Sequence, residues 1–272
     1  MRDIPIFYEE RGTGRPLLVL HGWPGDHRMM MPSLEPLFEQ RSDWRRLYPD
    51  LPGAGKTPGA DWIASQDQML EVTLGFLDAI APGERFAVAG GSYGGYLARG
   101  ILHERRAQID GVFMFVPLIE LDSAKRDLPT RQVLVREPDI VAALEPDESF
   151  WLEQVSVVQT REMLAAFRTT IKPSLASVDQ ALEERLEAHP AFSFDVDKLP
   201  EPFPAPTLIL TGRQDSLCGY REAWRLLDTY PRGTFAVLDR AGHGVAEEQP
   251  AVFRALVGEW LDRVEEFSKH KE

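Results

Sequence analysis

Short apolar runs recur along the chain and alternate with longer amphipathic segments. Five of these runs are rich in Val, Leu, Ile or Phe and end at Gly or Pro: residues 16–22, 85–91, 111–117, 206–212 and 235–242. Runs of this kind predict strands that are covered on both faces, as in a parallel sheet. Between them, three segments place apolar side chains mostly on one face, which predicts helices over residues 65–80, 93–106 and 251–267.

This alternation of strands and helices predicts the α/β class, with a doubly wound sheet. The first residues, IPIFYEERGTGRPLLVL, predict an antiparallel start to the sheet that turns at residues 12–14.

The alternation stops between Pro117 and Pro206, where helical patterns continue and no convincing strand is visible. Residues 149–171 form the longest of these patterns and residues 177–188 the next, before the proline-rich stretch LPEPFPAP. Because long connections without a role are uncommon in compact domains, we predict a helical cap over residues 122–203, inserted into a core formed by residues 1–121 and 204–272. Ordinary crossover connections with a missed strand are the alternative.

Composition narrows the possible partners. The 272 residues are 43% hydrophobic, which is enough for a sizeable core, and the formal net charge is −13. Such a surface repels nucleic acids and anionic membranes, so we expect neither as a partner and a small molecule as substrate. The single cysteine, Cys218, cannot form an internal disulfide, and MRDIPIFYEE lacks an apolar signal core. We therefore expect a cytoplasmic protein, while the sequence leaves the oligomeric state open.

The strongest chemical signal is AVAGGSYGG, residues 87–95, where a strand pattern meets a helix pattern. Gly90-Gly91-Ser92-Tyr93-Gly94 matches G-x-S-x-G in the strand–turn–helix context that this motif requires. In such a turn the serine hydroxyl projects above the sheet, and side chains in place of Gly90 or Gly94 would collide with the neighbouring strand and helix. Ser92 is thus the predicted nucleophile. A dinucleotide turn is the alternative, but GGSYGG has a side chain where G-x-G-x-x-G needs its second glycine.

A nucleophilic serine needs a base and an acid that orients the base. His243 lies between two glycines, after the last predicted strand and before the last predicted helix, where it can reach over the sheet. Asp215 follows the run 206–212 and gives the chain order Ser92, Asp215, His243 that this serine turn predicts. Glu120 and Asp122 are the competing acids.

The other histidines have less favourable positions. His21 is expected to tie its own loop together by hydrogen bonds. The rest lie in polar, helical or pre-proline contexts, which predict solvated surface or turn positions: His27, His103, His189 and His270.

The loop VLHGWPGD, residues 19–26, is placed to help stabilise an oxyanion. A tetrahedral intermediate needs two backbone donors, and we assign them to the N–H groups of Trp23 and Tyr93. Pro24 stiffens the turn that aims the Trp23 donor. The Trp23 indole either lines the acyl pocket or packs locally, and the sequence leaves both open.

HGWPG, GGSYGG, GRQD and AGH, in this order and at these separations, resemble the α/β-hydrolase superfamily over nearly the whole chain, with the predicted cap least matched. This resemblance implies an eight-stranded, mostly parallel sheet with a cap over a Ser-His-Asp triad, and it implies no metal and no organic cofactor. HGWPG is also similar to the loop of epoxide hydrolases, but those enzymes and the dehalogenases use an aspartate nucleophile where this chain has Ser92. GGSYGG is similar to the turn of proline iminopeptidases, whose usual HGGPG loop is altered here by Trp23.

The resulting prediction is a carboxylesterase-type serine hydrolase that cleaves a small ester or lactone. A proline iminopeptidase-like or carbon–carbon bond hydrolase is the alternative, and a non-catalytic ligand-binding protein of the same fold is the alternative from another class. The substrate pocket is predicted to draw on four cap residues, Phe150, Trp151, Met163 and Phe167, although packing between helix and core is the favoured explanation for each of them taken singly.

DLPGAGKTPG, residues 50–59, looks like the end of a phosphate-binding loop. The motif G-x-x-x-x-G-K-[ST] needs glycine at residue 50, which is Asp50, and a helix directly after Thr57, where Pro58 and Gly59 follow instead. We therefore expect no nucleotide binding. The stretch resembles a turn of the hydrolase family near the rim of the active site, with Lys56 exposed.

Overall fold

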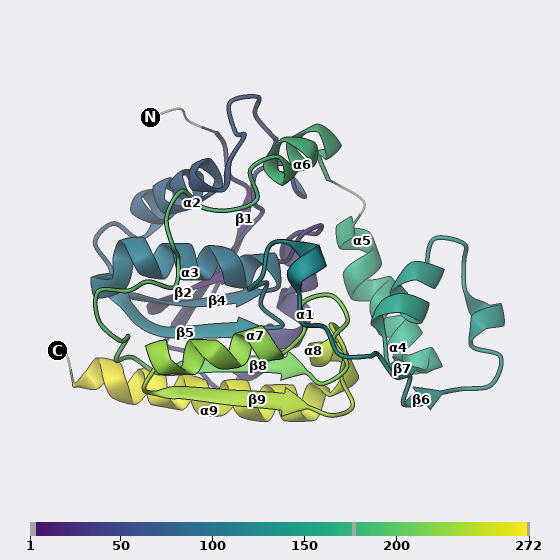
Figure 1. Cartoon of the computed structure of the whole chain (residues 1–272). Helices are drawn as coiled ribbons and strands as arrows, with labels where there is room; N and C mark the ends of the chain where they lie inside the picture. Colours follow the sequence, from purple (N-terminus) through teal and green to yellow (C-terminus); the bar gives the residue numbers. More distant parts are fainter. Residues whose placement is uncertain (1–3, 176–177, 271–272) are drawn as a thin grey trace.

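A seven-stranded sheet forms the centre of the computed structural model, which describes residues 4–175 and 178–270 (Figure 1). In spatial order its strands are β1 (Tyr8–Arg11), β3 (Trp44–Pro49), β2 (Arg15–Leu20), β4 (Phe86–Gly91), β5 (Ile109–Phe115), β8 (Thr207–Gly212) and β9 (Gly233–Leu238). All neighbouring strands are parallel except β1, which is antiparallel to β3. The predicted α/β class and all five predicted strands are confirmed, with ends that differ by a few residues.

Burial on both faces explains why these strands are apolar at consecutive positions. In β2, Leu18 and Leu20 pack into a core under α2 and α3, whereas Leu17 and Val19 pack into a second core on the opposite face. Successive side chains of a strand point to opposite faces, so a strand between two helical layers needs an apolar residue at every position.

Helices cover both faces of the sheet (Figure 1). On one face lie α2 (Gln66–Ile80), α3 (Tyr93–Arg105) and α7 (Arg221–Trp224), and on the other lie α1 (Met31–Leu34), α8 (Val245–Glu248) and α9 (Pro250–Lys269). The predicted helices correspond to α2, α3 and α9. Ser65 caps α2, because its side chain accepts a hydrogen bond from the backbone of Gln68. Short 3-10 turns complete the core at His27–Met29, Glu35–Phe38, Arg106–Gln108 and Arg225–Thr229.

The antiparallel start of the sheet differs in part from the prediction. The chain turns at Gly12 and Gly14, both at positive φ, but β1 pairs with β3 and not with β2. The eight strands implied by the resemblance are also wrong, since the described residues form seven strands in this sheet. Residues 4–7 add no strand: the N–H of Phe7 donates to the side chain of Thr57, and its carbonyl accepts from Asp50, directly after the pairing of β1 with β3.

The regular structure of the segment between β5 and β8 is mainly helical. It contains α4 (Arg161–Ala166), α5 (Lys172–Leu175) and α6 (Gln180–Glu187), π-helical turns at Phe150–Val155 and Phe167–Ile171, and 3-10 turns at Ser123–Lys125 and Val141–Ala143. Part of it has its own apolar cluster, built around Leu152, Leu164 and Phe167. In Figure 1, α4 and α5 lie beyond the ends of the strands and α6 lies beside α2. Its status as a separate cap with boundaries at 122 and 203 stays a prediction, and we call it the inserted segment.

The continuous helix predicted over 149–171 is wrong. The structure breaks it with the short strand β7 (Val158–Gln159), which pairs with β6 (Val135–Arg136), so the expectation of no strand in this segment is wrong as well. The break falls at VSVVQT, where β-branched side chains favour extended backbone, and Thr160 then caps α4. The pattern at 177–188 gives α6, which is capped by Asp179; residue 177 itself lies outside the described residues.

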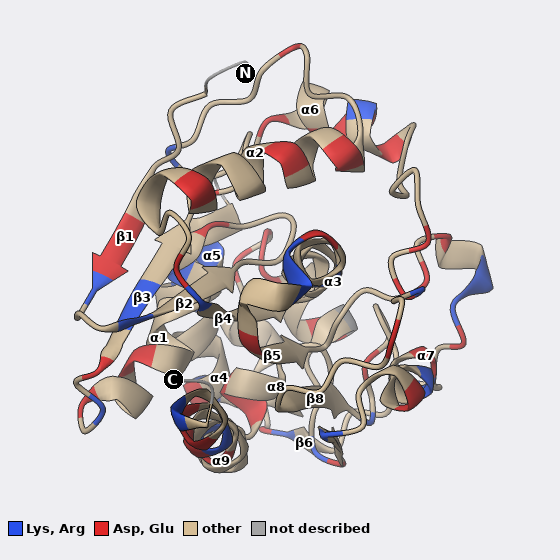
Figure 2. Ribbon diagram, turned by 90° about the vertical axis from the view of Figure 1, so that its left-hand side faces the viewer, with Lys and Arg blue, Asp and Glu red and all other residues tan. Residues whose placement is uncertain are grey.

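Charge is unevenly distributed over the elements. Figure 2 shows acidic residues along α2 and α6.

Within the described part of the chain, no helix has the length and apolar character needed to cross a membrane.

Shortening Phe113 to alanine tests the core under α9. Phe113 is fully buried in β5, and its ring lies 5.8 Å from that of Phe253 and 5.6 Å from that of Trp260. We expect Phe113→Ala to lower the free energy of unfolding by about 3–5 kcal/mol, measured by urea denaturation. The exposed control Val252→Ala should change it by less than about 0.5 kcal/mol. Equal effects of the two variants would contradict the described packing.

Candidate active site

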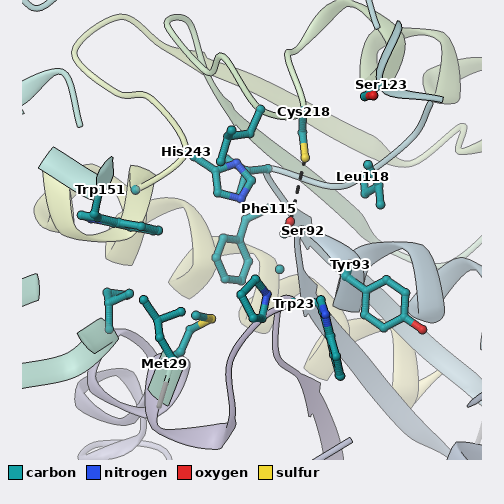
Figure 3. A pocket seen from close by; sticks show the side chains of 18 of the residues that line it. Trp23, Met29, Ser92, Tyr93, Phe115, Leu118, Ser123, Trp151, Cys218 and His243 are labelled. Atoms are coloured by element: carbon teal, nitrogen blue, oxygen red, sulfur yellow. Dashed lines mark hydrogen bonds between the residues drawn. The ribbon is translucent and has the colours of Figure 1, made fainter. Parts of the chain in front are cut away.

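Ser92 occupies the turn between the end of β4 and the start of α3. Its backbone has φ 50° and ψ −116°, a region that a residue with a side chain rarely adopts. Hydrogen bonds hold it there: the N–H of Ser92 donates to the carbonyl of Phe115, and its own carbonyl accepts from Gly95 and Leu118. The side chain projects into the cavity, where Figure 3 shows it close to His243 and Cys218.

The flanking glycines are required by direct backbone contact. A Cβ atom on Gly90 would lie 2.2 Å from the carbonyl oxygen of Gly94. A Cβ atom on Gly94 would lie 2.2 Å from the carbonyl oxygen of Leu20 in β2. Both distances are far inside van der Waals contact, so the collisions predicted from the sequence are present in the structure.

Asp215 and His243 meet above the ends of β8 and β9. The Nδ1 atom of His243 lies 3.0 Å from Oδ2 of Asp215. The carboxylate is fully buried, and its other oxygen accepts the backbone N–H groups of Leu217 and Cys218. These contacts fix the carboxylate, whose Oδ2 is left to hold Nδ1 of His243.

The environment of His243 favours its charged form. Burial lowers the pKa of the ring, but the carboxylate of Asp215 and the sulfur of Cys218 outweigh burial and keep the pKa well above its usual value.

The competing acids do not replace Asp215. Glu120 and Asp122 line the cavity, but Glu120 accepts from the backbone of Asp122, which in turn pairs with Lys125. The structure thus pairs His243 with Asp215.

The loop after β2 carries Trp23 to the edge of the same cavity, beside Tyr93. The two rings meet edge to face with centroids 6.3 Å apart, and the Trp23 indole donates to Glu183 of α6 at 2.9 Å. The side chain of Trp23 is therefore both pocket wall and packing contact. The oxyanion role of the Trp23 and Tyr93 N–H groups stays a prediction.

Two buried histidines form hydrogen bonds within and next to this loop. Nδ1 of His21 lies 2.8 Å from the carbonyl of Gly22, and its Nε2 accepts the N–H of Leu51. Burial lowers the pKa of His21, which keeps the ring neutral, as the second contact requires. The expectation that His27 is solvated is wrong: it is buried and binds Asp50 at 2.7 Å, because Asp50 supplies a buried acceptor that the local sequence does not reveal.

Residues 50–59 contact the beginning of α6. The carbonyl of Gly53 accepts the N–H of Asp179, and Ala54 forms a bridge with Val178. A Cβ atom on Gly53 would lie 2.5 Å from Leu182 of α6, so the glycine permits close approach. Lys56 is exposed, as expected, with its ammonium over the ring of Phe7.

The cavity in front of Ser92 has a volume of about 1100 Å³ and a largely apolar lining. Of the predicted cap residues, Phe150, Trp151 and Phe167 line it, and the rings of Trp151 and Phe167 stack. Met163 does not line the cavity, which corrects its prediction. It lies in the first turn of α4, which packs against α8, and its methyl group faces Gly244.

Several residues of the site were missed from the sequence. Cys218 lines the cavity with its sulfur 3.9 Å from Oγ of Ser92. Its position three residues after Asp215 is the one signal that pointed to it. Glu247 also lines the cavity, and burial raises its pKa. Glu183 reaches the site only through the folding of the inserted segment, which no local pattern of residues indicates.

Metal-ligating atoms lie within 4.8 Å of one another in two groups of described residues, Asp215–Cys218–His243 and Asp26–His27–Asp50. In both groups the side chains are already bound within the protein. His243 binds Asp215, Asp50 binds His27, and Asp26 binds Arg28. We assign a metal to neither group.

Comparison with known proteins gives consistent matches over most of the chain. A family model described as "Alpha/beta hydrolase family" matches residues 17–256. A pimeloyl-[acyl-carrier protein] methyl ester esterase of Legionella pneumophila (strain Paris) is 24% identical over 94% of this chain and 99% of its own. A 2-hydroxymuconate semialdehyde hydrolase of Pseudomonas sp. (strain CF600) is 26% identical over 93% and 88%. The solved structure of an alpha/beta superfamily hydrolase from Oenococcus oeni PSU-1 is 27% identical, covers 96% of both chains and gives a TM-score of 0.87.

Alanine at Gly94 tests the packing of the serine turn. Since the new methyl group would collide with the backbone of β2, we expect Gly94→Ala to lower the free energy of unfolding by about 1–3 kcal/mol or more. Gly258→Ala, in the middle of α9 with no neighbour closer than 3.9 Å, is the matched control. It should stabilise the protein by up to about 1 kcal/mol. Urea denaturation measures both, and a neutral Gly94→Ala would contradict the geometry.

Proposed function

The chain belongs to the alpha/beta hydrolase family, and from this we propose that it is a serine hydrolase that cleaves a small-molecule ester or lactone. One observation carries the proposal: Ser92 in its strained turn lies in the same cavity as His243, which is bound to the buried Asp215. This is the arrangement of nucleophile, base and orienting acid that acyl transfer needs.

In the proposed reaction, Oγ of Ser92 bonds to the acyl carbon while its proton passes to Nε2 of His243. The bond from the acyl carbon to the leaving oxygen then breaks, and the alcohol takes the proton from His243. A water molecule then gives a proton to His243 and bonds to the acyl carbon of the acyl-enzyme. The bond from that carbon to Oγ of Ser92 breaks, Oγ takes the proton back from His243, and the acid leaves. Asp215 stays ionised throughout, orienting the ring and stabilising its charged form.

The oxyanion of both tetrahedral intermediates is assigned to the N–H groups of Trp23 and Tyr93. Tyr93 is the first residue of α3, so its N–H is among those at the positive end of a 13-residue helix. The packing of Trp23 against Tyr93 supports a fixed separation between these two donors.

The cavity favours substrates without negative charge. Among its described lining residues, Arg126 is the one basic side chain besides His243, and its guanidinium donates to the carbonyls of Glu120, Leu121 and Leu217. Acidic side chains outnumber it on the lining, among them Glu183, Glu187 and Glu247. A neutral ester with an apolar acyl group fits this lining better than an anionic one.

Other reactions of related hydrolases use a similar site, so the substrate panel should extend beyond esters. Purified protein can be assayed on p-nitrophenyl esters, lactones, aminoacyl amides and a vinylogous 1,5-diketone. Turnover of the amides or the diketone, with none of the esters, would replace the esterase assignment. Failure of Ser92 to react with a fluorophosphonate would favour a non-catalytic binding protein.

Removing the Ser92 hydroxyl tests the nucleophile. We expect Ser92→Ala to lower kcat/KM for p-nitrophenyl butyrate by roughly 10³-fold or more, because no other group of the turn replaces Oγ. Ser42→Ala, in an exposed loop, should stay within about twofold of wild type. Turnover by Ser92→Ala at the wild-type rate would refute the assignment.

The pH profile tests the base. His243 acts as a base only when neutral, and its pKa lies above the usual value. We expect kcat/KM to rise tenfold per pH unit below that pKa and to level off above it, with the midpoint above 6.5. Asp215→Asn removes the charge that raises the pKa, so the midpoint should move to lower pH and the plateau should fall by about 10²–10⁴-fold. A midpoint unchanged in Asp215→Asn would contradict the pairing.

A further inference from the structure

Glu248, the last residue of α8, is a buried acid that binds backbone groups from two separate parts of the chain. Oε1 accepts the N–H groups of Val157 at 2.6 Å and Val158 at 3.1 Å. Oε2 accepts the N–H of Gly242 at 2.6 Å. Val157 and Val158 belong to the inserted segment, whereas Gly242 directly precedes His243.

The contact is close enough to fix one backbone against the other. A Cβ atom on Gly242 would lie 2.6 Å from the carbonyl oxygen of Val155, so the inserted segment passes directly over the histidine loop. On the opposite side, the carbonyl of Ala241 accepts the N–H of Gln214, next to Asp215. The residues before His243 are therefore held between the loop of Asp215 and the inserted segment.

A carboxylate suits this position because it only accepts hydrogen bonds and has room for all three donors. Burial and the neighbouring Glu247 raise the pKa of Glu248 to about 7, against the pull of the three N–H groups. The hydrogen bonds from these three backbone groups therefore offset part of the cost of burying Glu248.

We propose that Glu248 is a positioning residue, which fixes the backbone of Gly242 against the inserted segment and so holds His243 in register with Ser92 and Asp215. This rests on the role of His243 in the proposed function. It also means that the segment forming the pocket wall and the loop carrying the base are joined through one side chain.

Glu248→Gln tests the proposal with almost no change in shape. The amide has one accepting oxygen and one NH₂ group, so at least one of the three backbone donors loses its acceptor. We expect kcat for p-nitrophenyl acetate to fall about tenfold or more per active molecule, counted by fluorophosphonate titration, with KM changed by less than threefold. Glu248→Asp, which keeps the carboxylate, should recover part of the loss.

Glu222→Gln is the matched control. Glu222 is also buried, and its carboxylate accepts the backbone N–H of Asp127, at the start of the inserted segment. Because Glu222 accepts one backbone N–H where Glu248 accepts three, the amide oxygen can keep that contact, and kcat should stay within twofold of wild type. Equal kcat values per active molecule in wild type, Glu222→Gln and Glu248→Gln would overturn the proposal.

Hydrogen exchange of the unmodified protein gives a second test that does not depend on a variant folding. If Glu248 joins the two segments, the amides of Val157, Val158 and Gly242 should be protected to a similar degree. Exchange of Gly242 more than a hundredfold faster than that of Val157 would overturn the proposal. His243→Ala separates the two failures: full activity in that variant would refute the proposed function, whereas an inactive His243→Ala with a fully active Glu248→Gln would refute the positioning role alone.

Discussion

The backbone of Ser92 is the constraint on which the rest of the site depends. A residue with a side chain is held at φ 50° only because three segments close around it: β2 through Leu20, β5 through Phe115, and α3 through its first turn. Strain of this kind persists only where the surroundings over-determine it. The two apolar cores of the sheet supply that rigidity, so the stability of the fold and the exposure of the hydroxyl have the same origin.

The parallel sheet then brings the other chemical groups to the same place. Because β4, β8 and β9 are parallel, the loops that follow them emerge at one edge and deliver Ser92, Asp215 and His243 together. Burial strengthens the pairing, since the Asp215 side chain accepts two backbone N–H groups and contacts the histidine ring where little water competes for it.

Features encoded by short-range patterns could be predicted from the sequence. The strands, the serine turn and the order of Ser92, Asp215 and His243 were of this kind. Features that depend on tertiary contacts could not: His27 is buried because Asp50 reaches it, Met163 turns to Gly244, and Glu248 meets Val157 across 91 residues of chain. The helix wrongly continued through residues 156–160 shows how amphipathic spacing can hide a β-branched break.

The attachment of the inserted segment has a consequence for how such a protein can diverge. Gly53 accepts the N–H of Asp179, and Glu248 accepts those of Val157 and Val158, so at these two places the core holds the main chain of the segment. Main-chain groups are the same whatever the side chains are. Side chains of the segment that line the cavity can therefore be exchanged without loss of these hydrogen bonds, and new specificities can arise on an unchanged core.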